Sequence, residues 1–526
     1  DSRAFVEAAE TMLRNDVGIE DAKKFVREKV SKSLKSTSST INPFVNRTPH
    51  LSPLEWFKLY VLGIIVIPVK MVLIIVLVIL AFVPAKLSQL GLSKEQRRMP
   101  LSGWRKAVLL PVRLLVRVVM FVLGFYWISI KGSPDPRARI IVPNHCSFID
   151  PCCFFFLIAP HFVAKSDVAK VPLVGVVFQA LQPILVDRMS VNSRQETADE
   201  IKRRATWEGP NDWSPTVLFP EGTCSNGTAL IAFKYGAFTP GVPVQPVIIR
   251  YPFVNFDPSF VAGVSGTMLW LRLLVQFVNF MEIEFLPLYE PNEEEKKDAP
   301  LFANNVRNVM ARAMNVSTTE HTYEDVVLQV EALKENLPRN TALLQSRKLK
   351  KQLTQLSLEE MKTQLRAFSV MDKTKSGRVN LEQFQNALNL PDSPLVQELF
   401  SLLDVDQSGT VDFREYLAGK ALIGRGLSSE ESLRLAFDAF DLDKSGEIDV
   451  AELERAMRPA FPGINKEMAQ SIFNSIAREN DAVVTFDEFK QHMTKYPEYL
   501  SLFVQFKAKA KRESEPSITD ADKKDQ

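Results

Sequence analysis

The hydrophobic positions divide the chain into regions with different periods, and the first is a nearly unbroken apolar run from Val61 to Val83. This run is long enough to cross a hydrocarbon core, which takes about 20 residues. Pro68 and Lys70 lie near its middle, where a proline removes a helical hydrogen bond and a lysine costs roughly 3 kcal/mol. We therefore expect a membrane-embedded helix that is either a straight span or a bent, re-entrant segment.

A second apolar stretch, residues 107–128, is interrupted by Arg113 and Arg117, which are spaced to share one helical face. We interpret it as an interfacial helix, the alternative being a buried soluble helix whose two arginines reach solvent. Cations dominate its surroundings and indicate a cytoplasmic, lipid-facing side. Against the single acid Glu95 stand seven cations: Lys94, Arg97, Arg98, Arg105, Lys106, Arg113 and Arg117.

Short apolar runs then alternate with helical periods up to about residue 315, which predicts an α/β layer. The candidate strands are ARIIVPN, PILVDR, TVLFP, VPVQPVIIRY and EIEFLPL. We place the boundaries as follows: a polar segment over 1–55, membrane-embedded and interfacial helices over 56–130, an α/β domain over 131–320, a helical connector over 321–360, an all-α domain over 361–500 and a charged tail over 501–526.

Composition changes this picture little. The net charge of +2 and mean hydropathy of −0.03 exclude a polyanion-binding chain and one that is membranous throughout, so no nucleic-acid partner is expected. The four cysteines are too sparse for a secreted disulfide scaffold and indicate reduced, packed thiols. Cys152 and Cys153 are adjacent and so poorly placed to ligate one tetrahedral zinc ion, and we expect no catalytic metal.

The all-α domain carries two complete EF-hand loops, DVDQSGTVDFRE and DLDKSGEIDVAE, which predict two calcium sites. Calcium takes six to eight oxygen ligands, and this spacing supplies side-chain oxygens, one backbone carbonyl and a bidentate glutamate. The first loop offers Asp404, Asp406, Ser408, Thr410, Asp412 and Glu415. The second offers Asp441, Asp443, Ser445, Glu447, Asp449 and Glu452.

Each complete loop is expected to pair with a degenerate one. The loop DKTKSGRVNLEQ has Gln383 at the twelfth position and so loses the bidentate ligand. The loop that ends at Glu488 has Ala477 and Ala482 where an acid and a glycine belong. We predict two lobes, each with one competent and one degenerate hand.

The segment NHCSFIDP places His145 and Asp150 five residues apart. In a helix this separation leaves the two roughly 140° out of alignment, so only an irregular turn could bring them together. Asp150-Pro151 resembles a helix start, which leaves two interpretations. Asp150 could simply cap the helix, or it could hold the imidazole so that the second ring nitrogen acts as a general base. A nucleophilic-serine elbow, G-x-S-x-G, is absent.

NHCSFID resembles the H-x4-D motif of the glycerolipid acyltransferases, and FPEGTCSN resembles their E-G-T motif. GVVFQALQPILVDR and VPVQPVIIRYP complete the family's order of blocks. The C-terminal EF-hands make the chain similar to lysophosphatidylcholine acyltransferases. The resemblance implies an α/β acyltransferase domain with N-terminal membrane-embedded helices, followed by an all-α EF-hand domain. It also implies re-acylation of a lysophospholipid, with acyl-CoA as co-substrate.

The same resemblance implies roles for individual residues. His145 would take the proton from the acceptor hydroxyl, and Asp150 would orient the imidazolium. The acceptor would be positioned by Arg188, Glu221, Gly222 and Thr223, with Lys234 as a further phosphate candidate. Glu221 could face a cationic head group or orient the arginine, while Cys224 is expected to pack rather than to act as nucleophile.

The resemblance also implies an endoplasmic-reticulum membrane location with the active site and EF-hands in the cytosol, the Golgi and lipid droplets being alternatives. Lys523 and Lys524 resemble a dilysine retrieval signal. Two alternative functions stay open: a lysophosphatidic acid acyltransferase, and a calcium-responsive membrane scaffold with an inactive transferase domain. The sequence leaves acyl-chain preference, calcium affinity and oligomeric state undecided.

Overall fold

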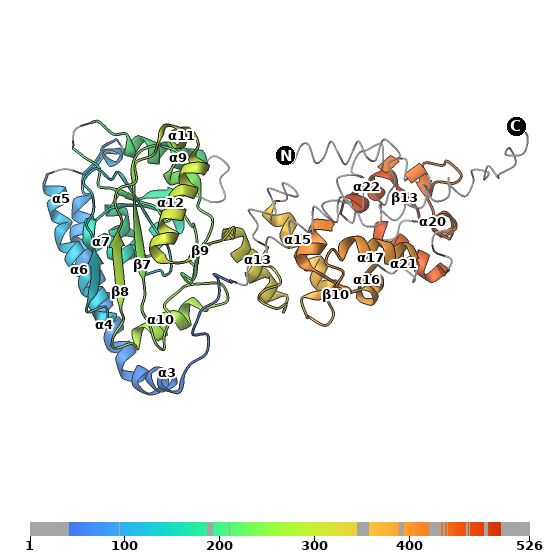
Figure 1. Ribbon diagram of the computed structural model, residues 1–526, viewed down its shortest axis with the longest axis horizontal. Helices are drawn as coiled ribbons and strands as arrows, with labels where there is room; N and C mark the ends of the chain where they lie inside the picture. Colours follow the sequence, from blue (N-terminus) through green and yellow to red (C-terminus); the bar gives the residue numbers. More distant parts are fainter. Residues whose placement is uncertain are drawn as a thin grey trace, which may run out of the picture. The chain divides into compact units, whose positions relative to one another are not determined.

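The computed structural model forms two compact units, which divide between Val327 and Leu328, inside the segment expected to be a connector (Figure 1). The residues that the structure describes are 41–93, 95–101, 103–186, 193–209, 211–344, 357–388, 394–419, 433–434, 437–438, 440–458, 461, 463–477 and 482–495.

The first unit is built on a seven-stranded sheet in the order β1-β8-β7-β2-β5-β3-β4. Neighbouring strands are parallel except for the β7–β8 pair. The five strands expected from the sequence are all present, whereas β1 and β3 were not expected because each adjoins a longer apolar helical run. The strands are β1 Ile128–Lys131, β2 Ile140–Pro143, β3 His161–Lys165, β4 Ile184–Val186, β5 Thr216–Val217, β7 Val244–Arg250 and β8 Met281–Phe285.

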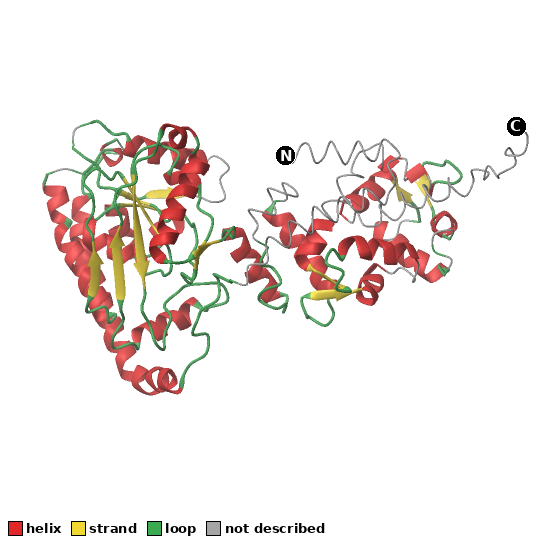
Figure 2. Ribbon diagram, viewed as in Figure 1, coloured by secondary structure: helices red, strands yellow, loops and turns green. Residues whose placement is uncertain are grey.

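Alternate residues of the central strands supply two separate cores, so helices cover both faces of the sheet (Figure 2). Ile141 and Ile249 pack beneath α6 Leu110–Val122, α7 Asp150–Ile158, α8 Val174–Ala180 and α10 Gly266–Leu274. Ile140 and Ile248 pack beneath α9 Ser193–Ala205 and α12 Ala299–Met314. The unit also contains α5 Trp104–Val108, α11 Glu293–Lys297 and the strand pair β6 Ala229–Leu230 and β9 Ser317–Thr318, and the division between the two units falls within α13 Tyr323–Lys334.

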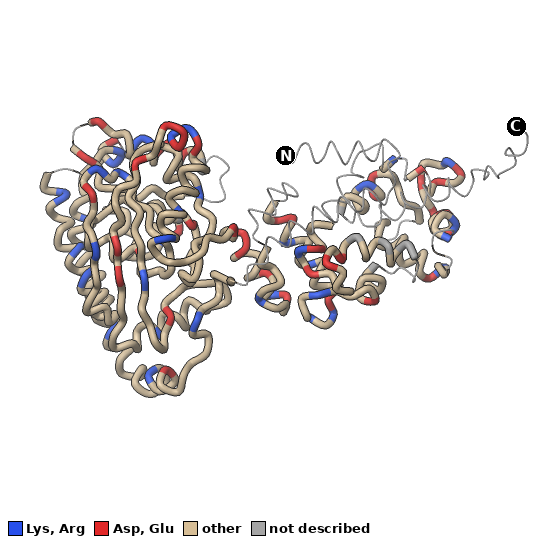
Figure 3. The backbone as a smooth tube through the Cα atoms, viewed as in Figure 1, with Lys and Arg blue, Asp and Glu red and all other residues tan. Residues whose placement is uncertain are grey.

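The apolar run forms one continuous helix of 36 residues, Pro53–Ser88, made of α3 Pro53–Phe57, a π-helical turn Lys58–Leu62 and α4 Gly63–Ser88. One stripe of α4, including Ile74, Ala81 and Ala85, is buried against the sheet domain. Lys70 donates to the backbone oxygen of Gln276 at 2.7 Å, which explains how a cation is accommodated in this run. Lys70 and Lys86 are the charged residues of α4. Lys and Arg, without Asp or Glu, also occur along α5 and α6 (Figure 3).

Helix α6 packs beside α4, and its two half-buried arginines are hydrogen-bonded to backbone oxygens of the same unit. Arg113 donates to the backbone oxygens of Phe156 and Leu157 at the end of α7, and Arg117 donates to those of Phe125 and Tyr126. Neither arginine therefore needs to reach lipid or solvent. The outward face of α6 carries a helical stripe of exposed apolar side chains, namely Leu110, Leu114, Val118 and Phe121.

The chain on both sides of the Pro53–Ser88 helix is fixed to the same unit. Before it, a docking segment of residues 41–51 lies against the domain, with Phe44 fully buried and the Asn46 amide donating to the backbone oxygens of Asp257 and Ser259 at 3.0 and 3.2 Å. After it, the Gln89 amide donates to the backbone oxygen of Val176 in α8 at 3.1 Å, and Arg105 donates to those of Ser88 and Leu90, both at 2.8 Å.

The second unit contains paired helix–loop–helix modules around one apolar core, which takes in Leu328, Leu337 and Leu344 from the expected connector. The predicted pairing is confirmed: β10 pairs with β11, and β12 with β13, so each complete loop lies beside a degenerate one. Its elements are α15 Leu358–Met371, β10 Arg378–Asn380, α16 Leu381–Leu388, α17 Pro394–Leu403, β11 Thr410–Asp412, β12 Glu447–Ile448, α20 Val450–Met457, α21 Lys466–Ile476, β13 Val484–Thr485 and α22 Phe486–Lys495.

Candidate active site

The irregular turn that the sequence required connects β2 to α7. Strand β2 ends at Pro143, and the Asn144 side chain then fastens the turn to β7 by exchanging two hydrogen bonds with the backbone of Ile249, at 2.7 and 3.0 Å. The turn brings His145 Nδ1 to 2.8 Å from Asp150 Oδ2. The two side chains therefore meet, which neither a helix nor a strand at this spacing would allow.

The interpretation of Asp150 as a helix cap is wrong. Ile149 occupies the N-cap position without a side-chain cap, and Asp150 is the first residue of α7. Its carboxylate turns back into the preceding loop, where Oδ2 also accepts from the backbone N–H groups of Cys146 and Ser147 at 2.7 and 3.0 Å. Asp150 is completely buried, so this carboxylate serves the histidine turn and not the helix.

The His145 ring is the accessible part of the pair, since its side chain retains 19% exposure against 0% for Asp150. The ring stacks on Phe219 with 4.2 Å between centroids. Burial alone would lower the pKa of His145, but the adjacent Cys224 sulfur and Asp150 carboxylate outweigh it, and the pKa lies well above its ordinary value. The raised pKa shows that the protonated imidazolium is stabilised at this position, chiefly by the charges that surround the ring.

The E-G-T motif lies directly against the histidine turn. Glu221 is 1% exposed, and its Oε1 accepts from the backbone N–H of His145 at 2.8 Å. Burial raises the pKa of Glu221 to about 7. Gly222 has φ +67°, a backbone conformation that favours glycine, and a Cβ there would lie 2.7 Å from Lys234 Cε, so the lysine side chain would have to move. Thr223 follows, half-buried.

The structure thus brings five of the predicted site residues to the histidine turn or the E-G-T turn beside it, with Lys234 next to Gly222. Arg188 lies outside the described residues. Burial raises the pKa values of Cys146 and Cys153 well above their ordinary range, as expected for packed thiols.

Sequence reasoning missed Tyr251, whose phenol donates to Asp150 Oδ1. Tyr251 directly follows β7 in the block VPVQPVIIRYP, and its side chain is almost fully buried. The available signal was an aromatic residue with a polar tip at the end of an otherwise aliphatic, buried strand.

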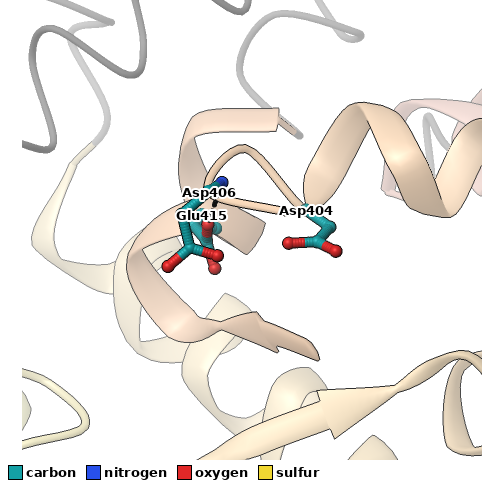
Figure 4. A group of neighbouring side chains, drawn as sticks. All are labelled: Asp404, Asp406 and Glu415. Carbon is teal, nitrogen blue, oxygen red and sulfur yellow. Dashed lines mark hydrogen bonds between the residues drawn. The ribbon is translucent and has the colours of Figure 1, made fainter. Parts of the chain in front are cut away.

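The calcium loops have a suitable donor set. Ligand oxygens of Asp404, Asp406 and Glu415 all lie within 4.8 Å of one another, and so do those of Asp441, Asp443 and Glu452. Figure 4 shows Asp406 beside Glu415, whose Oε1 accepts from the Asp406 backbone N–H at 3.2 Å. Burial and the nearby Asp412 and Asp406 carboxylates raise the pKa of Glu415 to about 7, a crowding that a divalent cation would relieve.

Family models match an acyltransferase domain over residues 130–250, an EF-hand domain pair over 430–494 and a single EF hand over 395–418. The chain is 36% identical to mouse lysophosphatidylcholine acyltransferase 2 over 88% of its length and 85% of that protein. It is also 36% identical to rat lysophosphatidylcholine acyltransferase 2B, over 90% of this chain and 92% of that protein. This chain belongs to the lysophosphatidylcholine acyltransferase family. Mouse lysophosphatidylcholine acyltransferase 1 is 34% identical over 87% of this chain and 86% of that protein.

Family membership confirms the predicted enzyme class, an acyltransferase, and the predicted combination of an acyltransferase domain with calcium-binding EF-hands. His145 and Asp150 both lie in the matched acyltransferase region, as do Glu221 and Gly222.

Proposed function

We propose that this protein transfers an acyl chain from acyl-CoA to the free hydroxyl of a lysophospholipid, with lysophosphatidylcholine as the main acceptor. The observation that carries the proposal is the 2.8 Å contact between His145 Nδ1 and the buried Asp150 carboxylate. The names of the relatives support the acceptor class. Because Nδ1–H donates to Asp150, the lone pair of the ring belongs to Nε2, the nitrogen available to a substrate.

The reaction is a direct displacement. His145 Nε2 accepts the proton of the acceptor hydroxyl while the hydroxyl oxygen attacks the thioester carbonyl carbon. The tetrahedral intermediate then expels the CoA sulfur, which takes the proton from the imidazolium, leaving the new ester and free CoA. Asp150 stabilises the imidazolium during this cycle. No step requires a protein nucleophile. Cys224 therefore acts as a packing residue beside His145.

The E-G-T turn supports this chemistry from two sides. Glu221 holds the His145 backbone, while Gly222 allows Lys234 to approach the turn closely. We propose that Lys234 and Arg188 provide positive charge for the acceptor phosphate, with Thr223 as a hydroxyl donor. Lys234 is exposed, as such a role requires.

Calcium binding to the two complete loops is proposed to modulate activity, membrane docking or stability. Asp404, Asp406 and Glu415 would hold one ion, and Asp441, Asp443 and Glu452 the other. Bound calcium would neutralise these crowded carboxylates and so change the balance of charge at each loop.

We further propose that the protein lies in the endoplasmic-reticulum membrane without crossing it, with both units in the cytosol. Beyond its buried stripe, α4 exposes Ile64, Ile65, Val72 and Val83, each by more than half, which fits embedding in one leaflet. Both flanks of the helix dock on the same domain, which supports placing them on the same side of the membrane. The dilysine tail lies outside the described residues.

The decisive experiment measures incorporation of labelled acyl chains by the purified full chain, using a panel of lysophospholipid acceptors and acyl-CoA donors. General-base catalysis contributes about 10²- to 10⁴-fold, so His145→Ala and Asp150→Asn should each lower kcat by factors in this range. His50→Ala is the matched control, because His50 is exposed and belongs to the docking segment before the apolar helix. Lysophosphatidylcholine should give the highest kcat/KM.

Full turnover by His145→Ala would refute the mechanism. A higher kcat/KM for lysophosphatidic acid would correct the acceptor while leaving the mechanism intact. Incorporation without acyl-CoA would remove the proposed donor.

A further inference from the structure

Asp150 is shared between two partners that approach different oxygens. Oδ2 accepts from His145 Nδ1 and from two backbone N–H groups of the turn, whereas Oδ1 accepts from the Tyr251 hydroxyl. Among these donors, which all belong to the described residues, Tyr251 is the one from outside the histidine turn. It therefore links the sheet to the catalytic pair.

The environment of Tyr251 keeps its hydroxyl protonated and therefore a hydrogen-bond donor. Burial, together with the charge of Asp150, raises the pKa of Tyr251 well above its ordinary value, so the hydroxyl stays protonated. The ring is held edge-on against the fully buried Phe125, with 6.2 Å between centroids. A rigid strand end and a fixed ring thus aim one hydrogen bond at one carboxylate oxygen.

Resting on the proposed general-base function, we propose that Tyr251 is a positioning residue for acyl transfer, which acts on His145 through Asp150. The hydroxyl fixes the rotation of the Asp150 carboxylate so that Oδ2 faces the imidazole. It also withdraws negative charge toward Oδ1, which limits how strongly Asp150 stabilises the imidazolium. Tyr251 thereby sets both the orientation and the basicity of His145.

Removal of the hydroxyl has a directional consequence. In Tyr251→Phe, the full carboxylate charge acts on the ring, so the imidazolium becomes more stable and the pKa of His145 rises. Because a general base must be neutral to accept a proton, the acid limb of the kcat/KM profile moves to higher pH. Loss of a hydrogen bond to a charged group corresponds to a decrease in kcat of roughly 10- to 100-fold.

The test compares wild type, Tyr251→Phe and Tyr289→Phe in kcat, KM and pH profile. Tyr289 is the matched control, since its hydroxyl also donates to a carboxylate of the same domain, Glu295 Oε1 at 2.6 Å, away from the histidine turn. A second readout, independent of turnover, is the pH dependence of His145 modification by diethyl pyrocarbonate, followed by mass spectrometry. This reagent reacts with neutral imidazole.

We expect Tyr251→Phe to lower kcat with little change in KM and to shift both the activity limb and the modification profile to higher pH. Wild-type profiles in Tyr251→Phe would overturn the inference. So would a lower melting temperature without a pH shift, because that result describes a purely structural residue. Activity in His145→Ala would instead overturn the proposed function, so the two failures are distinguishable.

Discussion

Glu221 accepts a hydrogen bond from the His145 backbone and is shut off from solvent, which favours a role in supporting the turn over contact with a head group. We predict that Glu221→Gln retains most activity, because the amide keeps an acceptor oxygen and the native carboxyl, with a pKa of about 7, is already partly neutral. Glu221→Ala should lose activity, since an unsatisfied buried N–H costs about 1–3 kcal/mol. Steady-state kinetics and melting temperatures check both.

The pH dependence of stability offers a second check on Glu221. A carboxyl whose folded pKa is raised stabilises the protein at low pH, and this contribution is lost as pH rises from about 4.3 toward 7. Wild type should therefore lose stability across this window relative to Glu221→Gln.

The kinetics of Glu221→Gln also test the alternative role. A raised KM for lysophosphatidylcholine in this variant, at unchanged kcat, would show that Glu221 contacts the head group.

Sequence reasoning could identify the residues of the proposed catalytic pair but not the partners that hold them. His145 and Asp150 stand out by residue type and spacing. The donation from Tyr251 to Asp150 joins residues 101 positions apart, and only the adjacency of β2 and β7 brings them together. For the same reason, spacing alone suggested that Asp150 could cap α7, because nothing local shows that its carboxylate turns backward.

At the scale of elements, the degenerate hand does more than complete the pair. Through the β10–β11 pairing, Arg378 Nη1 donates to Thr410 Oγ1 at 3.0 Å and to the calcium-ligand candidate Ser408 Oγ at 3.3 Å. A guanidinium thus lies beside the loop that would bind a divalent cation. Gln383 of the same hand donates to Thr374 Oγ1 at 3.3 Å, so the residue at the twelfth position bonds within its own loop.

We predict that Arg378→Gln tightens calcium binding at the 404–415 loop. Two unit charges about 4 Å apart in water interact by about 1 kcal/mol, and salt screens this exposed site, so a roughly three- to tenfold gain is expected. The measurement is a calcium titration in a Glu452→Gln background, which confines binding to the first loop. Arg455→Gln, on α20, is the matched control. Unchanged or weaker binding would show that Arg378 does not tune the site.

Hydrophobic periodicity predicted the apolar helix and five strands, and the spacing of oxygen ligands predicted both EF-hand pairs, because these depend on local patterns. It did not predict how α4 lies. Whether an apolar helix crosses a bilayer depends on which parts of the protein its flanking residues bind. The contacts of Lys70 with Gln276 and of Asn46 with Asp257 join distant parts of the chain, so no local pattern predicts them.

At the scale of the whole molecule, the docking segment makes membrane topology testable. Asn46-Arg47-Thr48 is a glycosylation sequon, yet the Asn46 amide is buried and hydrogen-bonded within the domain. We predict that Asn46 carries no glycan in cells. Epitope tags at the two ends of the chain should both be digested by protease added to sealed microsomes, with a lumenal protein as the protected control. Protection of the N-terminal tag would establish a crossing.

The attachment of residues 41–51 to the catalytic domain also bears on biosynthesis. If no hydrophilic segment has to cross the bilayer, the sheet and its helices can fold in the cytosol. The exposed apolar side chains of α4 and α6 can then bind the membrane after folding. Such a protein could also settle on a surface bounded by a single phospholipid layer, where a chain with ends on opposite sides could not be accommodated.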